Sequence, residues 1–397
     1  MKNYKMIVQG FDFGPFVSKL VIDWGEPLAA PAPEDFKISV IKEGSFSDAA
    51  PILEGTRKVT AAYTTGPQLV LELEVSPLCT IGNALMVDYV DKGQGREYNG
   101  QRWADPYEHK LSYKGKDCPL ACVEVVREIA DLFECGSFES RGIKLQYSHF
   151  TPPEAKISKR PLIIWLHGAW EGSFFGNHPA NVAIMGNKAV ALADDKIQKI
   201  MQGAYVLAPQ TPTMWMDDGS GMYTQDGTSM YDAVLAELID TYINSCPNID
   251  SKRIYIGGCS NGGFMTMKML FVRPGLFAAA FPICHGYNPE WITDEMLNSI
   301  KHIPIWQVHS WNDEVLAGSF ADGVHKRLLD AGAANTVCTI YNDVVDVTGR
   351  WQDENGKPWV YDAHATWVPV YNNDVSADID GKQVQIFDWM AAMHIQP

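Results

Sequence analysis

Hydrophobic and polar positions follow two different patterns along the chain, and the change comes near residue 125. In the first part, short stretches alternate apolar and polar residues, which is typical of strands with one buried face. In the clearest stretch, 69–75, three leucines and a valine share one face and two glutamates lie on the other. Further strands are predicted over 16–24 and 84–90, with breaks containing Pro or Gly between stretches. Regular short strands of this kind predict a β-sandwich.

From about residue 126 the pattern changes to continuous apolar runs separated by helical stretches. The run Pro-Leu-Ile-Ile-Trp-Leu at 161–166 indicates a strand that is buried on both faces. In the stretch 230–243 apolar residues recur every three to four positions, which is typical of a helix with one buried face. Strands that alternate with helices predict a doubly wound, mainly parallel α/β sheet. The other predicted strands cover 204–208, 253–257, 278–283, 305–309 and 336–341.

These patterns predict two domains, a smaller all-β sandwich over 1–125 and a larger α/β domain over 126–397. A length of 397 residues agrees with that division. No apolar run approaches the roughly 20 residues of a membrane span. The first residues also lack the apolar core of a signal peptide, so a cytoplasmic location is expected.

Charge and cysteine content exclude several classes of partner. The net charge is -16 at pH 7, and binding to nucleic acid or to anionic membranes depends on basic patches. We therefore expect neither a nucleic acid nor a membrane as partner, while homo-oligomer formation stays open. The eight cysteines are dispersed without a C-x2-C pair, so reduced thiols and no metal site are expected.

The sequence Gly258-Cys259-Ser260-Asn261-Gly262 has the pattern G-x-S-x-G. An apolar strand precedes it and a helical stretch follows, which is the context of a nucleophile elbow that exposes a serine hydroxyl above a sheet. Glycines are required there because side chains would collide with the neighbouring strand and helix. The pentapeptide alone arises by chance in about one chain in ten of this length. The interpretation of Ser260 as a nucleophile therefore depends on its surroundings.

A serine nucleophile needs a base and an acid that orients the base, and on this fold they follow the serine in the order acid, then histidine. Asp313 lies in the turn just after the predicted strand 305–309, where an acid is expected. A turn-capping role is the alternative interpretation of this aspartate. The other candidates for the acid are Glu314, Asp343 and Asp346.

Three histidines follow Asp313, namely His325, His364 and His394. His325 lies in a helical stretch and His394 lies three residues from the end of the chain. His364 lies in a loop after the last apolar strand, which favours it as the base.

An oxyanion hole needs two backbone N–H donors. One is expected from Asn261, the residue after the nucleophile, and the other from the loop 167–172 after the first buried strand. Ala169 and Trp170 are both candidates for that second donor.

Four segments together resemble the α/β-hydrolase superfamily, and more narrowly the esterases near its prolyl-oligopeptidase and polyhydroxybutyrate-depolymerase groups. The segments are LIIWLHGAWEG, DSKRIYIGGCSNGGFMTM, PIWQVHSWNDEV and AHATWVPVY. The resemblance implies that Ser260 is the nucleophile, Asp313 the acid and His364 the base. The opening GFDFGPFVSKLVI resembles the N-terminal immunoglobulin-like domain of some bacterial carboxylesterases of that branch. In the loop after the first strand, Trp170 replaces a glycine of the family and the family's arginine is missing.

The implied reaction is acyl transfer from an ester to water, without a metal or an organic cofactor. Aromatic residues crowd the segments that are expected near the site, which favours small or aromatic esters as substrates. A feruloyl or acetyl esterase acting on plant-wall fragments is a narrower version of this prediction. The predicted substrate-binding residues are Trp170, Trp215, Trp311 and Trp351, and the same segments hold Phe174, Phe175, Met214, Met216 and Tyr223.

Two other functions compete with an esterase. A serine peptidase of the prolyl-oligopeptidase type would use the same triad, although about 125 residues are too few for the propeller that such enzymes carry. A non-enzymatic protein could bind carbohydrate or protein through its sandwich while the hydrolase domain is inactive. The presence of all three triad candidates in order argues against this second alternative.

Overall fold

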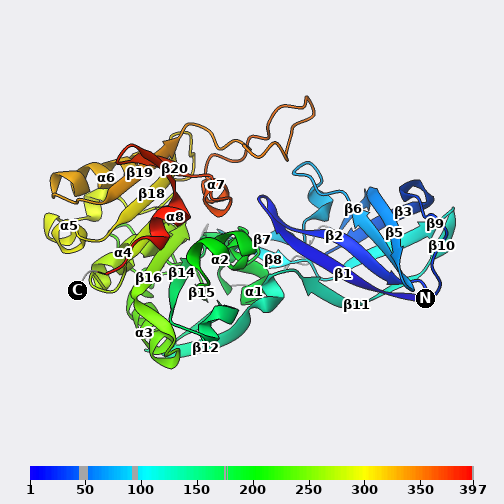
Figure 1. The fold of residues 1–397 in the computed structure, drawn as a ribbon, viewed down its shortest axis with the longest axis horizontal. Coiled ribbons are helices and arrows are strands. Elements are labelled where there is room, and N and C mark those ends of the chain that lie inside the picture. The colour runs from blue at the N-terminus through cyan, green and yellow to red at the C-terminus, as the bar shows by residue number, and fades with distance from the viewer. Residues whose placement is uncertain (44–51, 92–96, 174–175, 177, 396–397) are drawn as a thin grey trace. The chain divides into compact units, whose positions relative to one another are not determined.

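The computed structural model describes residues 1–43, 52–91, 97–173, 176 and 178–395. The chain forms two compact units, Met1–Leu132 and Phe133–Pro397 (Figure 1). The domain boundary predicted after residue 125 falls inside a strand of the first unit, Leu120–Arg127. Among the described residues, no helix has the length and apolar character needed to cross a membrane.

In its described residues, the first unit consists of strands and three short 3-10 turns. Its strands are β1 (Lys2–Phe11), β2 (Gly14–Asp23), β3 (Phe36–Lys42), β4 (Leu53–Arg57), β5 (Val59–Thr65), β6 (Gln68–Leu73), β7 (Leu85–Asp91), β8 (Glu97–Trp103), β9 (Tyr107–Tyr113), β10 (Lys116–Cys118) and β11 (Leu120–Arg127). They form a five-stranded sheet in the order β11-β1-β2-β6-β5, a four-stranded sheet in the order β10-β9-β3-β4, and the pair β7-β8. β1 pairs with β11 in parallel, and the other strands pair antiparallel.

Alternating side chains of this unit are buried, as the sequence pattern predicts. Leu69, Leu71 and Leu73 of β6 are at most 3% exposed. The ring of Tyr4 on β1 contacts the ring of His109 on β9, with centroids 5.9 Å apart, so the buried faces of the two sheets meet. The unit is therefore an all-β arrangement of two packed sheets.

The second unit is built on one eight-stranded sheet flanked by helices (Figure 1). Its strands are β12 (Glu134–Ser140), β13 (Ile143–Phe150), β14 (Arg160–Leu166), β15 (Tyr205–Gln210), β16 (Ile249–Cys259), β17 (Ala279–Ile283), β18 (Ile305–Ser310) and β19 (Thr336–Tyr341). The helices are α1 (Pro179–Val182), α2 (Asp195–Met201), α3 (Asp232–Ser245), α4 (Asn261–Val272), α5 (Asp294–Ile300), α6 (Ser319–Asp330), α7 (Trp367–Tyr371) and α8 (Ile386–Ala391), and a small hairpin joins β20 (Ser376–Ile379) to β21 (Lys382–Gln385).

The strand order is β12-β13-β15-β14-β16-β17-β18-β19. Six neighbouring strands of this order run parallel, namely β15, β14, β16, β17, β18 and β19. The pairs β12-β13 and β13-β15 are antiparallel. The mainly parallel sheet was predicted from the sequence, but the hairpin β12-β13 was not. The residues of β12 are exposed or partly buried, and in β13 only Leu145, Ser148 and Phe150 are buried, so the hairpin lacks the continuous apolar run that marks the inner strands.

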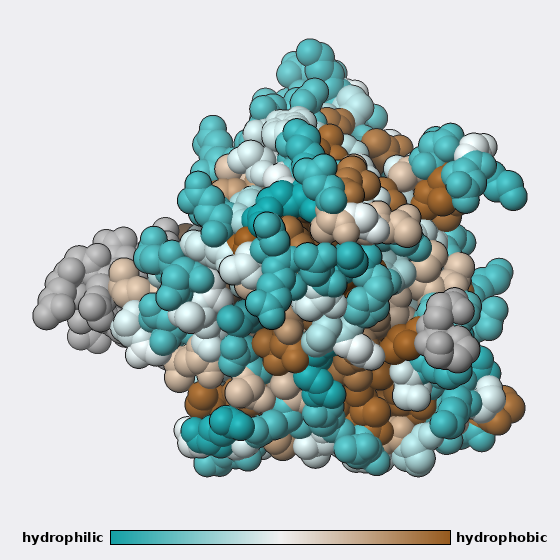
Figure 2. Space-filling model, turned by 90° about the vertical axis from the view of Figure 1, so that its left-hand side faces the viewer, coloured by the Kyte–Doolittle hydropathy of each residue, from teal (hydrophilic) through white to brown (hydrophobic). Residues whose placement is uncertain are grey.

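The core of the second unit lies on both faces of the central strands. Every side chain from Leu162 to Leu166 in β14 is completely buried. Helix α4 packs on β14, β16 and β17, with α3 and α5 beside it, while α2 and α8 pack together as a second group (Figure 1). The outer face shown in Figure 2 is mostly polar, with apolar side chains scattered across it. The sheet thus provides a rigid frame whose strand ends can carry reactive side chains.

Candidate active site

Ser260 lies in the turn between β16, which ends at Cys259, and α4, which begins at Asn261. Its backbone has φ +57° and ψ -115°, a region that residues other than glycine rarely occupy. The neighbouring strand holds this turn, because the N–H of Ser260 donates to the carbonyl of Ile283 at 2.9 Å. The strand-turn-helix context that was predicted for the motif is therefore present.

The two motif glycines are required by close approach of backbone atoms. A Cβ on Gly258 would lie 2.5 Å from the carbonyl oxygen of Leu166, and a Cβ on Gly262 would lie 1.9 Å from the same oxygen. Both positions are tighter than any real Cβ contact, so the start of α4 can only pack on the end of β14 as it does when both residues are glycine. The steric explanation given for these glycines is thereby confirmed.

Asp313 and His364 are joined by a hydrogen bond of 2.7 Å between Oδ2 and Nδ1. Asp313 lies three residues after β18, and its carboxyl is completely buried. The other carboxylate oxygen, Oδ1, accepts the backbone N–H groups of Val315 and Leu316 at 2.8 and 2.9 Å. These contacts orient the His364 ring, whose loop is itself held by the N–H of His364 donating to Asp362 at 2.8 Å.

Hydrogen bonding decides the charge state of Asp313. Burial by itself would raise the pKa of this carboxyl, but hydrogen bonds from His309 and His364 outweigh it and hold the pKa well below its usual range. Asp313 is therefore ionised at neutral pH, as a residue that stabilises a neighbouring imidazolium must be.

The structure brings His364 to Asp313 and places the other candidates elsewhere. Glu314 is exposed, Asp343 accepts a hydrogen bond from Asn312, and Asp346 accepts one from Thr348. His325 on α6 contacts Thr336, and His394 contacts the carbonyl of Ala392. Among the described residues, Ser260 and His364 form no direct hydrogen bond, which is common for catalytic pairs in the absence of substrate.

Cys284 connects the serine turn to the acid, and sequence reasoning missed it. Its thiol accepts the N–H of Ser260 at 3.2 Å. Burial raises the pKa of this thiol, and the nearby charge of Asp313 raises it further, so the thiol is neutral. The sequence signal that could have identified Cys284 is its position directly after the predicted strand 278–283. Among the described residues, no group of three His, Cys, Asp or Glu side chains could hold a metal ion.

The loop after β14 turns through Gly168 into a 3-10 turn, Ala169–Glu171. His167 is completely buried and fixes the loop, because its Nε2 accepts the N–H of Thr211 at 3.1 Å and its Nδ1 donates to the carbonyl of Gly168 at 2.6 Å. Burial lowers the pKa of His167 to about 4, so this ring is neutral. Within the described part of the chain, the amides of Ala169, Trp170 and Asn261 have no partner, which leaves all three available as oxyanion donors.

Glu171 holds the same loop from the inside. Its Oε2 accepts the N–H of Gly168 at 2.7 Å and the side-chain amide of Asn187 at 2.8 Å, while Oε1 is buried without a partner in the described structure. Burial raises the pKa of Glu171 to about 8, because the ionised form would be desolvated. Sequence analysis did not identify this residue, whose burial depends on packing against Asn187 from a distant segment.

The raised pKa of Glu171 predicts a pH-dependent stability. The unfolded chain loses this proton near pH 4.5 and the folded chain near pH 8, so the free energy of unfolding should fall as pH rises between these values. Glu171→Gln keeps the shape of the protonated acid but does not titrate. Its free energy of unfolding should therefore not show this decrease with pH. Urea unfolding at pH 5 and pH 8 measures it, with Glu354→Gln on the exposed surface as control. If the free energy of unfolding changed equally between pH 5 and pH 8 in wild type and in Glu171→Gln, Glu171 would be ionised over this whole range.

The four predicted substrate-binding tryptophans have different environments. Trp170 is 46% exposed and Trp311 is 48% exposed, so both can contact a ligand. Trp351 is 7% exposed and packs under the guanidinium of Arg350, 4.6 Å from the ring centroid. Trp215 is completely buried, with its ring 5.2 Å from that of His167. The prediction that Trp215 contacts substrate does not fit its burial, and the residue instead supports His167. Phe174 and Phe175 lie outside the described residues.

Comparison with known proteins gives similarities to esterases. A family model described as phospholipase/carboxylesterase matches residues 154–346, a range that contains Ser260 and Asp313 and ends before His364. The chain is 27% identical over 182 residues to the bifunctional acetylxylan esterase/xylanase XynS20E of Neocallimastix patriciarum. That match covers 46% of this chain and 23% of the relative, so it spans about a quarter of the relative's length.

A solved structure described as a thermostable esterase is similar over almost the whole chain. The TM-score is 0.74 at 23% sequence identity, and the alignment covers 98% of this chain and 99% of the other. The second unit therefore has an α/β-hydrolase fold.

Proposed function

We propose that this protein is a serine carboxylesterase that hydrolyses small or aromatic carboxylic esters through Ser260, His364 and Asp313. The observation that carries the proposal is the hydrogen bond of 2.7 Å between His364 Nδ1 and the buried carboxylate of Asp313. It leaves Nε2 of the same ring as the proton acceptor, and the elbow serine lies at the end of the nearby strand β16.

In the proposed reaction Ser260 Oγ attacks the ester carbonyl and gives its proton to His364 Nε2. The negative oxygen that forms is stabilised by the amide of Asn261 together with that of Ala169 or Trp170. His364 then passes the proton to the leaving alcohol, which leaves an acyl-Ser260 ester. A water molecule, deprotonated by His364, attacks this ester and releases the acid and the free serine.

The test is hydrolysis of p-nitrophenyl acetate, butyrate and octanoate, followed by a prolyl p-nitroanilide. Turnover of the short esters that exceeds cleavage of the amide supports a carboxylesterase. The reverse preference would favour a peptidase of the prolyl-oligopeptidase type. Absence of all four activities would contradict the proposal and favour an inactive scaffold.

The narrower proposal is an acetyl or feruloyl esterase acting on plant-wall fragments. The name of the curated relative, an acetylxylan esterase, supports it for acetyl groups. Release of acetate from acetylated xylan, or of ferulate from methyl ferulate, distinguishes the two acyl classes. The immunoglobulin-like character of the first unit, a cytoplasmic location and a small-molecule ester as partner, with no nucleic acid or membrane, are further parts of this proposal.

Trp170 is proposed to form one wall of the acyl pocket, since it lies in the proposed oxyanion loop and nearly half of it is exposed. Trp170→Ala should lower kcat/KM for an aromatic acyl ester, such as methyl ferulate, by about tenfold more than for p-nitrophenyl acetate. Steady-state kinetics on both substrates measure the ratio. Tyr63→Ala, at an exposed aromatic residue on β5 of the first unit, serves as the control and should leave the ratio unchanged. An equal loss on both substrates would show that Trp170 is not an aromatic acyl wall.

A further inference from the structure

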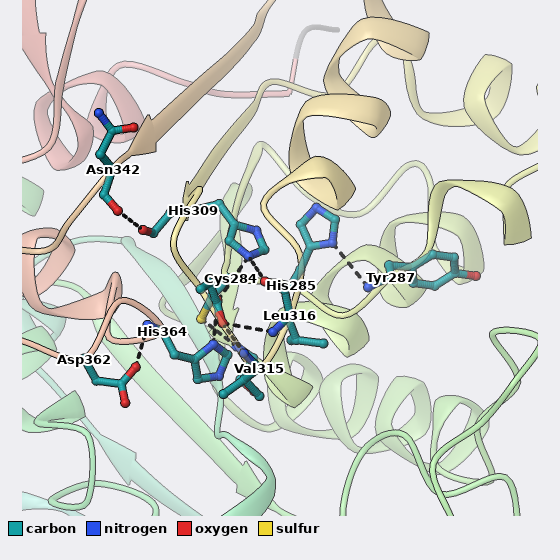
Figure 3. Close-up of polar contacts among 12 residues, drawn as sticks. Cys284, His285, Tyr287, His309, Val315, Leu316, Asn342, Asp362 and His364 are labelled. Atoms are coloured by element: carbon teal, nitrogen blue, oxygen red, sulfur yellow. Dashed lines mark hydrogen bonds and ion pairs between the residues drawn. The ribbon is translucent and has the colours of Figure 1, made fainter.

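His309 is a second imidazole that contacts the acid of the proposed triad. It is the fifth residue of β18, where Figure 3 labels it. Its side chain is completely buried. Its Nε2 lies 3.2 Å from Asp313 Oδ2 and 3.1 Å from the carbonyl oxygen of Leu316. Both partners are hydrogen-bond acceptors, so Nε2 must carry the proton.

The oxygen that His309 contacts is the one that His364 also uses. Asp313 Oδ2 thus receives N–H groups from two imidazoles, while Oδ1 receives the backbone N–H groups of Val315 and Leu316. Four donors therefore surround one buried carboxylate. Such a carboxylate is fixed in orientation, and each donor withdraws part of its negative charge.

We propose that His309 is a positioning residue whose Nε2–H donates a hydrogen bond to Asp313 Oδ2. This bond fixes the orientation of the carboxylate toward His364. It also reduces the negative charge of the carboxylate that acts on the His364 ring. This inference rests on the proposed function only in treating His364 as the base. Without the donor, the full charge of Asp313 would act on the imidazolium form of His364 and stabilise it. More of His364 would then be protonated at a given pH, and less would be available to accept the proton of Ser260.

Among the described residues, the side chains that contact His309, apart from Asp313, are uncharged. The ring of His285, after β17, meets it edge-on with centroids 6.1 Å apart, and burial lowers the pKa of His285 to about 3. His285 is held by Gln307 Oε1 at 2.8 Å from its Nε2. The adjacent thiol of Cys284 is neutral as well, since burial raises its pKa. Asp313 is therefore the ionised side chain to which the His309 proton points.

The experiment compares the pH profiles of kcat/KM for p-nitrophenyl butyrate in wild type, His309→Leu and His309→Gln. In His309→Leu the acid limb should move to higher pH by about one unit. The Gln side chain can place an N–H near the position of Nε2, so His309→Gln should keep the limb near that of wild type. An unmoved limb in His309→Leu, with activity lowered equally at all pH values, would show that His309 has only a structural role.

A second measurement does not depend on turnover. In protein labelled with ¹³C-histidine, the titration midpoint of the His364 Cε1 signal should rise in His309→Leu and not in His309→Gln. If the wild type hydrolyses no ester, the proposed function fails, while this titration still decides the role of His309. If the Leu variant does not fold, His309→Asn, whose shorter amide does not reach Asp313, replaces it with the same expected rise.

Discussion

Replacement of Ser260 by alanine is expected to lower kcat/KM for p-nitrophenyl butyrate by roughly 10⁴- to 10⁶-fold. In the proposed reaction the variant lacks the group that would form the covalent acyl-enzyme, so only substrate binding and the proposed oxyanion donors would remain to accelerate attack by water. Stopped-flow release of p-nitrophenol, with the initial burst in the wild type and none in the variant, measures the loss.

Ser376→Ala is the matched control, since Ser376 is exposed on β20 and should leave kcat/KM unchanged. Both variants should have the same urea midpoint of unfolding as the wild type. That result would exclude a folding defect as the cause of the lower kcat/KM. Activity that persists in Ser260→Ala would show that the strand-turn-helix at 257–263 is not a nucleophile elbow. In that case the hydrogen bond between Asp313 and His364 would need another explanation.

A methyl group at Gly262 should destabilise the protein by at least about 3 kcal/mol. Gly262 lies in the first turn of α4, where helix propensity alone would favour Gly→Ala by about 1 kcal/mol. The steric term is larger and opposite, because the new Cβ would lie 1.9 Å from the Leu166 oxygen and 2.6 Å from the His167 oxygen. Both atoms belong to the backbone at the end of β14, so neither can move without displacing the oxyanion loop.

Equilibrium unfolding in urea measures the change, with Gly275→Ala as control. Gly275 is exposed in the turn after α4, and a Cβ there would meet nothing within 4 Å. The control should therefore stay within about 0.5 kcal/mol of wild type. If Gly262→Ala were as stable as the control, the packing of α4 on β14 would be looser than the structure shows.

The sequence predicted the inner strands of the second unit because burial on both faces leaves a continuous apolar run. β14 and β18 follow this pattern, and the loop 167–172 and Asp313 come closely after them in the chain. The hairpin β12-β13 was missed because no residue of β12 is buried and the buried residues of β13 are interrupted by partly exposed ones, so it has no such run. The contact between Asp313 and His364 agrees with their proposed roles as acid and base, which chain order restricts to residues after Ser260.

Contacts between distant segments could not be predicted. His309, Cys284 and Glu171 gain their roles from neighbours on other elements, and nothing in the local pattern distinguishes a buried polar residue at a strand end from a solvent-facing one. The tryptophans show the same limit. Trp215 and Trp311 both lie in segments near strand ends, but one is completely buried and the other is half exposed.

The backbone of Ser260 has a consequence for how this protein would evolve. A serine at φ +57° and ψ -115° is disfavoured by about 1–3 kcal/mol relative to a relaxed conformation, and glycine would adopt the same turn at little cost. Cys284, which contacts Ser260, is also held at a positive φ, +36°. Selection for stability alone would therefore replace these residues, whereas selection for a reactive hydroxyl retains the serine. Under relaxed selection, the elbow is where mutations that increase stability and abolish the reaction would accumulate first.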